Sequence, residues 1–272
     1  MKKTTVLLLT LMLFITHSYA QSKTTQPFIL GEVQELYSRE LKENRKLNIY
    51  LPEGYSPDSA TTYPVIYLLD ASADQDFVHI VGVVQFLTMI DAMPKTIVAG
   101  IANVDRKRDF TFPTNRPDYK KELPTSGGSA AFIAFIEKEV QPFIKKKYKT
   151  NGIKTIIGQS LGGLLATEVL LKKPALFNNY IIVSPSLWWD EESLLHAAPQ
   201  LLQKQADSPL TIYVAVGSEG AVMENDAKSL DSTISASGKK QWRNTLVLLP
   251  AEYHLTILHN CVYKTLSMLY KK

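Results

Sequence analysis

The stretch "TIIGQSLGGLLATEVLL", Thr155–Leu171, joins a β-branched apolar run to an apolar run with helical spacing. Its centre reads Gly158-x-Ser160-x-Gly162 and is followed by Gly163. Glycine weakens strands and helices, so three glycines around one serine indicate a backbone shape that other residues cannot adopt. A nucleophile elbow, in which serine sits on a strained strand-to-helix turn with small neighbours, has this pattern in this context. The alternative is a corner built for packing, which is our interpretation of Gly163 but not of Gly158 and Gly162.

Apolar runs alternate with helical patterns along the rest of the chain. Runs without polar alternation suit strands buried on both faces of a parallel sheet, and strands that alternate with helices imply helices on both faces. The sequence therefore predicts an α/β fold with a mostly parallel, eight-stranded sheet that opens with an antiparallel hairpin. Pro142 is expected to kink or divide its helix because proline lacks an N–H. The expected hairpin strands are 32–38 and 46–51, the parallel strands 65–70, 96–101, 154–157, 180–183, 210–216 and 245–249, and the helices 76–90, 129–147, 161–172, 191–203, 227–237 and 256–270.

The N-terminus has the pattern of a secretory signal peptide. Two lysines precede an apolar stretch from Val6 to Ile15, and the small-residue segment "SYA" ends at Ala20. The apolar stretch is far shorter than the roughly 20 residues that a membrane-spanning helix needs. We therefore expect a signal peptide over residues 1–20, a single domain over residues 21–272, export to the periplasm or the medium, and no stable membrane anchor.

Composition limits the classes of function. With 272 residues, of which 45% are hydrophobic and 21% charged, the chain matches a globular protein with a sizeable core. The formal net charge of +4 falls to +2 without the two lysines of the signal, which is too small to favour nucleic acid or a membrane surface as partner. Cys261 is the only cysteine, so it forms no internal disulfide and is expected to be a buried apolar residue.

A serine hydroxyl needs a base, usually histidine, to become a nucleophile at neutral pH. His254 lies in "PAEYHLT", directly after the last expected strand, where the loops that surround Ser160 should lie. His259, inside the last expected helix, is the alternative. His79 and His196 fall in expected helices and are interpreted as ordinary structural residues.

The acid that orients the histidine should lie between the serine and the histidine in the chain. Glu219 is the first carboxylate after the strand expected at 210–216 and is the candidate. Glu224 and Asp226 are alternatives, although solvated charges at a helix start are the simpler interpretation of both. The backbone amide of Leu161, after the serine, is expected to stabilise negative charge on an attacked carbonyl.

Two tryptophans follow the strand expected at 180–183, in the segment "SPSLWWD". Trp188 and Trp189 are candidates for stacking on an aromatic or sugar-like substrate. Packing of the same side chains into the core, as anchors of the loop, is an equally good interpretation.

Two arginines lie in the long loop after the strand expected at 96–101. Arg106 and Arg108 are candidates for contact with an anionic substrate. Salt bridges with the neighbouring Asp105 or Asp109 are the alternative.

Several separated segments carry a family resemblance. From residue 32 to the C-terminus the chain resembles the putative esterase (esterase D-like) family of α/β-hydrolases, and its appearance is nearest to the periplasmic ferric-siderophore esterases and related hydrolases. The segments are "YPVIYLLD", "TIVAGIANVDRKRDFTFPT", "FIEKEVQPFIKKKYKT", "TIIGQSLGGLLA" and "SPSLWWDEESLL".

The resemblance implies an α/β-hydrolase fold with Ser160 as nucleophile and His254 as base. Glu219 matches the acid position of this subgroup. The resemblance also places the oxyanion hole at the backbone amides of Leu161 and Ala71. It implies a small-molecule ester as substrate. Because this chemistry needs only a nucleophile, a base and preorganised dipoles, no metal or organic cofactor is expected.

The function expected from these features is an exported serine carboxylester hydrolase that works through an acyl-enzyme, with siderophore trilactone esters as the most specific substrate. Esters of acylated carbohydrates, small esters, and acyl transfer on the same fold are alternatives. A non-catalytic binding module is a further alternative, against which the presence of serine, histidine and acid together argues.

Overall fold

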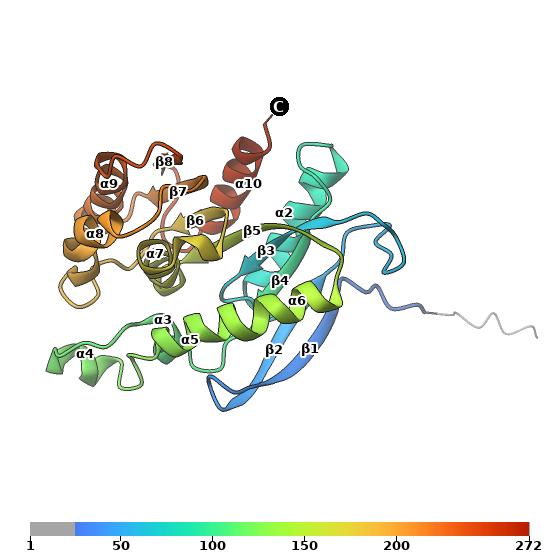
Figure 1. Cartoon of the computed structure of the whole chain (residues 1–272), viewed down its shortest axis with the longest axis horizontal. Coiled ribbons are helices and arrows are strands. Elements are labelled where there is room, and N and C mark those ends of the chain that lie inside the picture. Colours follow the sequence, from blue (N-terminus) through green and yellow to red (C-terminus); the bar gives the residue numbers. More distant parts are fainter. Residues whose placement is uncertain (1–24, 272) are drawn as a thin grey trace, which may run out of the picture.

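The computed structural model describes residues 25–271 as one eight-stranded sheet with helices packed against it (Figure 1). The strands are β1 (Glu32–Ser38), β2 (Glu43–Tyr50), β3 (Tyr63–Leu68), β4 (Ile97–Ile101), β5 (Thr150–Gln159), β6 (Asn179–Val183), β7 (Leu210–Gly217) and β8 (Trp242–Leu249). They are arranged in the order β1-β2-β4-β3-β5-β6-β7-β8. β2 runs antiparallel to both of its neighbours, whereas β3 to β8 run parallel to one another. The predicted α/β fold with an antiparallel opening pair is confirmed.

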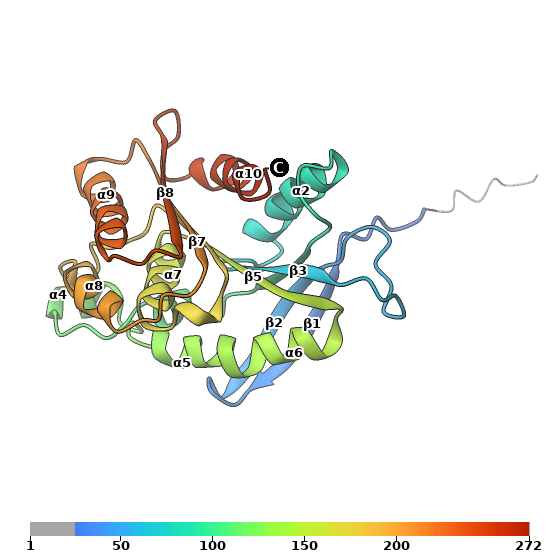
Figure 2. The ribbon, with the colours of Figure 1, turned by 45° about the horizontal axis from the view of Figure 1, so that its top comes forward.

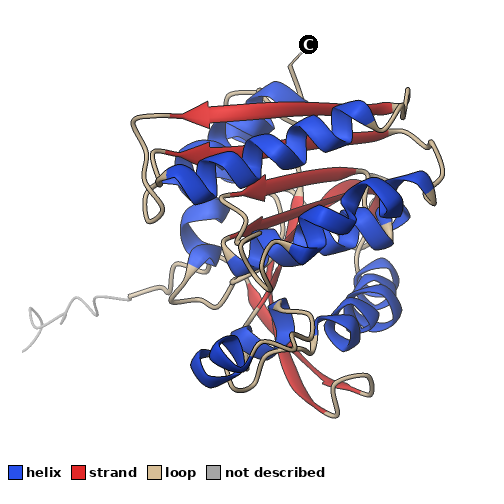
Figure 3. Ribbon diagram, turned by 90° about the vertical axis from the view of Figure 1, so that its left-hand side faces the viewer, coloured by secondary structure: helices blue, strands red, loops and turns tan. Residues whose placement is uncertain are grey.

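Helices cover both faces of the sheet (Figure 3). They are α2 (Asp76–Met89), α3 (Arg106–Phe110), α4 (Pro117–Glu122), α5 (Ser129–Phe135), the π-helical turn η1 (Ile136–Val140), α6 (Gln141–Lys147), α7 (Leu161–Lys172), the 3₁₀ turn η2 (Pro174–Leu176), α8 (Ser193–Gln203), α9 (Ala221–Ala236) and α10 (Ile257–Leu269). Helices α2 and α10 pack on one face, and α5 to α9 pack on the other.

The strand that leads to the serine shows why the sheet is buried on both sides. Ile156 and Ile157 are consecutive in β5, and neither is exposed to solvent. Successive side chains of a strand point to opposite faces, so Ile156 packs with the core under α7 and Ile157 with the core under α10. A continuous apolar run in the sequence is the result.

The helix expected over 129–147 is continuous, with a π-helical bulge before Pro142. The π-helical turn η1 lies between α5 and α6, and Pro142 lies in the first turn of α6. The Gln141 amide donates to the Ile136 carbonyl, five residues earlier, so the helix widens directly before the proline, which has no N–H of its own. The predicted division of the helix does not occur, and the structure has a π-helical bulge before the proline instead.

The structure adds two helices to the sequence prediction and lengthens a third. The loop after β4 contains α3 and α4, which the sequence did not indicate. Asp105 caps α3, since its side chain accepts a hydrogen bond of 3.0 Å from the Arg108 amide. The helix is too short and too polar to show the apolar periodicity by which helices are predicted from sequence. Helix α9 begins at Ala221 rather than Ala227, and its first turn, with Ala221 and Val222 exposed, shows no buried apolar face that the sequence pattern could reveal.

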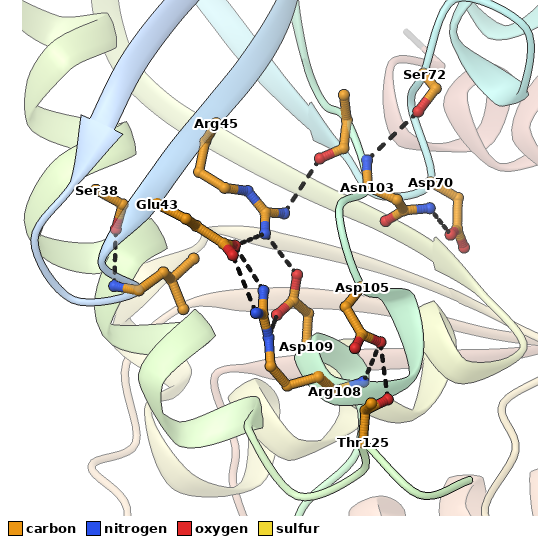
Figure 4. Close-up of polar contacts among 12 residues, drawn as sticks. Ser38, Glu43, Arg45, Asp70, Ser72, Asn103, Asp105, Arg108, Asp109 and Thr125 are labelled. Atoms are coloured by element: carbon orange, nitrogen blue, oxygen red, sulfur yellow. Dashed lines mark hydrogen bonds and ion pairs between the residues drawn. The ribbon is translucent and has the colours of Figure 1, made fainter.

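A buried group of charges joins β2 to α3 (Figure 4). The fully buried Arg45 contacts Asp109 at 2.7 Å and Glu43 at 2.8 Å. Arg108 contacts the same two carboxylates, with 2.8 Å to Asp109 and 2.6 Å to Glu43. The hydrogen bonds from Arg108, and to a smaller extent the one from Arg45, hold the pKa of Glu43 below its ordinary value. Each buried charge thus has an opposite partner, which removes most of the penalty for desolvation.

The signal peptide predicted for residues 1–20 lies outside the described part of the chain. Between residues 25 and 271, no helix is long and apolar enough to cross a membrane.

Candidate active site

Ser160 lies between the end of β5 and the start of α7, with φ 59° and ψ −121°. A non-glycine residue with such a φ is strained, and strain of this kind gathers at functional sites. A Cβ on Gly158 would lie 2.3 Å from the carbonyl oxygen of Gly162, so position 158 requires glycine. Position 162 is less crowded, since its Cβ would meet its nearest neighbour, the Asp70 carboxylate, at 3.3 Å. The backbone has the geometry of a nucleophile elbow.

Gly163 serves packing, as the sequence indicated. A Cβ at this position would lie 2.8 Å from the carbonyl oxygen of Val183 and 2.9 Å from the Cα of Pro185. Helix α7 therefore approaches the end of β6 more closely than any larger residue would allow.

Glu219 and His254 lie against each other beside this serine. Nδ1 of His254 and Oε2 of Glu219 are 2.5 Å apart. The other carboxylate oxygen of Glu219 accepts hydrogen bonds from the Ser184 hydroxyl at 2.5 Å and the Gly217 amide at 3.1 Å. The Glu219 side chain is 3% exposed, whereas the His254 side chain is 39% exposed. A carboxylate that accepts the Nδ1–H leaves Nε2 with a lone pair, which is the tautomer that a general base needs.

Contacts between neighbouring loops hold this pair in place. The Gln159 side-chain amide donates to the carbonyl oxygen of His254. The Ser218 amide donates to the Glu252 carbonyl at 2.8 Å, and a Cβ on Gly217 would lie 2.4 Å from the same oxygen. The loops after β7 and β8 are therefore packed backbone to backbone, which fixes Glu219 relative to His254.

Ser160 and His254 lie between two adjoining hollows. One, of about 500 Å³, is also lined by Ser186, Trp188, Ser218, Glu219, Met223 and Tyr253. The other, of about 330 Å³, is also lined by Asp70, Gln75, Asp76, Arg106, Gln159 and Leu255. The Ser160 hydroxyl lies 3.3 Å from that of Ser186 and, among the described residues, makes no hydrogen bond with His254. Catalytic hydrogen bonds often tighten only when substrate is bound.

The prediction that the Ala71 amide forms the oxyanion hole is wrong. Ala71 is fully buried, and its N–H donates to the Ile101 carbonyl at 3.2 Å. The chain turns at Asp70, whose φ is 52°, and this turn directs the next amide to β4. The Asp70 amide has no acceptor within residues 25–271, and Asp70 lines the hollow beside the serine. The Leu161 amide opens α7, where first-turn amides have no helical partner.

The two arginines have different positions. Arg106 lines the smaller hollow and forms a two-point salt bridge with Asp70, at 2.6 and 3.0 Å, rather than with Asp105 or Asp109. Asn103 donates to the same carboxylate at 2.6 Å (Figure 4). Arg108 lines neither hollow, because Glu43 and Asp109 engage it in the buried charge group, so the structure does not place it at the site.

The two tryptophans also separate. Trp189 is fully buried, stacks on Tyr119 with ring centroids 5.2 Å apart, and donates its indole N–H to the Phe112 carbonyl at 3.0 Å. It is a core residue that anchors the loop. Trp188 is partly exposed and lines the larger hollow with Ser160.

The other candidates lie outside the site. Glu224 accepts from the Glu219 amide at 3.3 Å but lines neither hollow. Asp226 is 4% exposed, so it is not the solvated charge that was expected. Burial, with the nearby Glu192 carboxylate, raises the pKa of Asp226 to about 6. Cys261 is buried as predicted, and burial raises the pKa of its thiol to about 12.

The remaining histidines are likewise outside the site. His259 contacts His79 across α10 and α2, with the two Nδ1 atoms 3.3 Å apart. His196 lies on the exposed side of α8. Neither hollow beside Ser160 is lined by any of the three.

Sequence reasoning missed two serines in the "SPS" segment after β6. Ser184 has a positive φ of 41° and donates to Glu219, and the Ser186 hydroxyl contacts that of Ser160. The only sequence signal for these serines was their position after β6, the strand next to β5. In a parallel sheet, the loops at the carboxyl ends of the strands form the binding site.

Comparisons with known proteins agree with this geometry. A model of the family described as "Putative esterase" matches residues 38–259. Ferri-bacillibactin esterase BesA of Bacillus subtilis (strain 168) is 32% identical over 267 residues, which cover 86% of this chain and 88% of BesA.

Solved structures of similar proteins have the same fold as this chain. An IroE-like serine hydrolase from Shewanella oneidensis superposes with a TM-score of 0.79 at 30% identity, covering 89% of this chain and 80% of that one. The BES protein from Bacillus cereus superposes with a TM-score of 0.78 at 26% identity, covering 91% and 98% respectively. The α/β-hydrolase fold is thereby confirmed.

Proposed function

The chain belongs to the "Putative esterase" family, and from this premise we propose that it is an exported serine carboxylester hydrolase that acts through an acyl-enzyme. The observation that carries the proposal is the 2.5 Å contact between Glu219 and His254 beside a serine held at φ 59°. Nucleophile, base and orienting acid thus come from three separate loops at one edge of the sheet.

The first half of the reaction forms the acyl-enzyme. The Ser160 oxygen attacks the ester carbonyl while Nε2 of His254 takes its proton, and the imidazolium so formed is stabilised by Glu219. The amides of Leu161 and Asp70 hold the negative oxygen of the tetrahedral intermediate. The C–O bond of the ester then breaks, and His254 returns the proton to the leaving alcohol.

The second half releases the acid. Water takes the place of the alcohol, gives a proton to His254 and attacks the acyl carbon. The bond to Ser160 breaks, the serine recovers its proton, and the carboxylic acid leaves. Every proton in the cycle passes through His254, so this chemistry needs no metal or organic cofactor.

For the substrate, we favour the trilactone esters of siderophores. This assignment is supported by the relative from Bacillus subtilis, whose name is ferri-bacillibactin esterase. It is also supported by Trp188 and Tyr253, which give the larger hollow aromatic walls on which a ring of the substrate can stack. Iron would enter as cargo of the substrate.

A substrate panel tests the proposal. Wild type and Ser160→Ala are compared on ferric and iron-free trilactone siderophores, feruloyl and acetyl sugar esters, and p-nitrophenyl esters. We expect siderophore cleavage by the wild type and none by the variant. Efficient cleavage of a sugar ester in its place would refute the substrate assignment, and full activity of Ser160→Ala would refute the mechanism.

Export is tested separately. Cells that express the whole chain are fractionated, and the N-terminus of the accumulated protein is determined by mass spectrometry. We expect a protein outside the cytoplasm that begins at Gln21. An uncut cytoplasmic protein would contradict export without affecting the esterase assignment.

A further inference from the structure

Two histidines meet on the face of the molecule that carries α2 and α10. These helices lie side by side (Figure 2). The rings of His79 on α2 and His259 on α10 have centroids 5.5 Å apart and planes tilted by 30°, and their Nδ1 atoms are 3.3 Å apart. Neither ring takes part in the proposed reaction, so the pair is available for another role.

A carboxylate fixes the state of one ring. Nε2 of His79 lies 3.2 Å from Oδ1 of Asp76, one helical turn earlier. A carboxylate can only accept, so Nε2 of a neutral His79 carries the proton and Nδ1 presents a lone pair toward His259. A carboxylate behind a histidine, with the free nitrogen facing forward, is the arrangement that orients metal-ligating histidines in proteins.

We propose that His79 and His259 together bind a zinc ion through their Nδ1 atoms. In tetrahedral coordination two nitrogens, each about 2.05 Å from zinc, lie about 3.3 Å apart, which matches the observed separation. His259 would bind as the Nε2–H tautomer, and its exposed ring leaves that nitrogen free to face water. On zinc binding, the proton of a neutral His259 moves from Nδ1 to Nε2, so no proton is released to the solvent.

Water completes the coordination. In the part of the chain from residue 25 to residue 271, no group of three or more histidine, cysteine or acidic side chains can hold a metal. The site therefore has two protein ligands, with Asp76 behind one of them. Its affinity should be lower than that of structural zinc sites with four protein ligands.

The position of the ion suggests its effect. Asp76, in the first turn of α2, lines the smaller hollow with Ser160, and α10 begins at Ile257, shortly after His254. An ion between the two helices would join the segments that border this hollow. Since it binds only the folded chain, it would stabilise the fold.

The test uses the full chain without an affinity tag, freed of metal with a chelator. Zinc chloride is titrated by isothermal titration calorimetry at pH 7.5, and the melting temperature is measured with and without zinc. We expect one ion per chain and, at tenfold excess over Kd, a melting temperature higher by about 3 °C. His79→Gln and His259→Gln should abolish both effects.

Matched variants separate binding from folding. His196→Gln removes an exposed helical histidine elsewhere and should bind zinc like the wild type. Asp76→Asn should weaken binding by about 10- to 100-fold. Ser160→Ala should bind zinc normally, because the site does not depend on the esterase reaction. Metal-free melting and circular dichroism show whether each variant folds.

Two results would overturn the proposal. One is no saturable binding by the wild type at millimolar zinc, which would leave the pair as a hydrogen bond between two rings. The other is unchanged binding in both folded variants, His79→Gln and His259→Gln.

Discussion

Replacement of Glu219 by glutamine should inactivate the enzyme while leaving the fold intact. The reason lies in the fixed neighbours of the carboxylate. One oxygen accepts from the Gly217 amide, which can only donate, so a glutamine must keep its oxygen on that side. Its NH₂ group then faces Nδ1 of His254 in place of the carboxylate oxygen.

This orientation selects the wrong tautomer of His254. Nδ1 must accept from the new amide, so the proton moves to Nε2, which can no longer take the proton of Ser160. In serine proteases, the equivalent loss of the acid lowers kcat by about 10⁴-fold, and we expect a loss of this order, or about 5 kcal/mol of barrier. Glu219→Asp keeps the charge and should lose far less.

The assay is kcat and kcat/KM on a p-nitrophenyl ester across pH 6 to 9, with the melting temperature of each variant as control. Higher pH should not rescue Glu219→Gln, because its defect is a tautomer rather than a protonation. A folded Glu219→Gln that retains more than a tenth of wild-type kcat would refute the reasoning.

The remaining predictions concern the elbow, the oxyanion segment and a buried acid. Gly158→Ala should lower the free energy of unfolding in urea by about 3 kcal/mol, because the new Cβ meets a backbone oxygen. Gly82→Ala, in open space on α2, should instead raise it by about 0.5–1 kcal/mol. Equal effects of the two changes would contradict this prediction. Arg106→Ala should lower kcat about tenfold, because loss of the salt bridge frees Asp70, whose amide is proposed to hold the oxyanion. An unchanged kcat would count against a role for the salt bridge between Arg106 and Asp70. The pKa of Asp226 is raised to about 6, so its ionised form destabilises the folded state at higher pH. Asp226→Asn should therefore raise the free energy of unfolding by about 1–2 kcal/mol at pH 8 and lose this advantage below about pH 4, where the aspartate is protonated in both states. Thermal melts across this pH range test the prediction, and a pH-independent effect would contradict it.

The parts of the site that could be predicted are those with local causes. The strained turn at Ser160 needs small neighbours within a few residues, and the glycines that provide them stand in the sequence. Glu219 lies in the loop after β7 and His254 in the loop after β8, and parallel strands all end at one edge of the sheet. Chain order and strand ends were therefore enough to bring these residues together.

The parts that could not be predicted depend on the path of the backbone or on distant partners. The left-handed turn at Asp70, which aims the Ala71 amide at β4, leaves no mark in composition or periodicity. Arg106 pairs with Asp70, more than thirty residues earlier, instead of its sequence neighbours. Asp226 has the sequence of a solvated helix start, but the packing of α9 buries it.

The central claim is that Ser160 is the nucleophile of an acyl-enzyme, and a fluorophosphonate probe tests it most directly. After incubation, intact-mass and peptide mass spectrometry would locate the phosphonyl group. The account predicts one adduct per chain, on Ser160, with loss of esterase activity in proportion to labelling and no labelling of Ser160→Ala. An adduct on another residue, or full esterase activity in completely labelled protein, would contradict it.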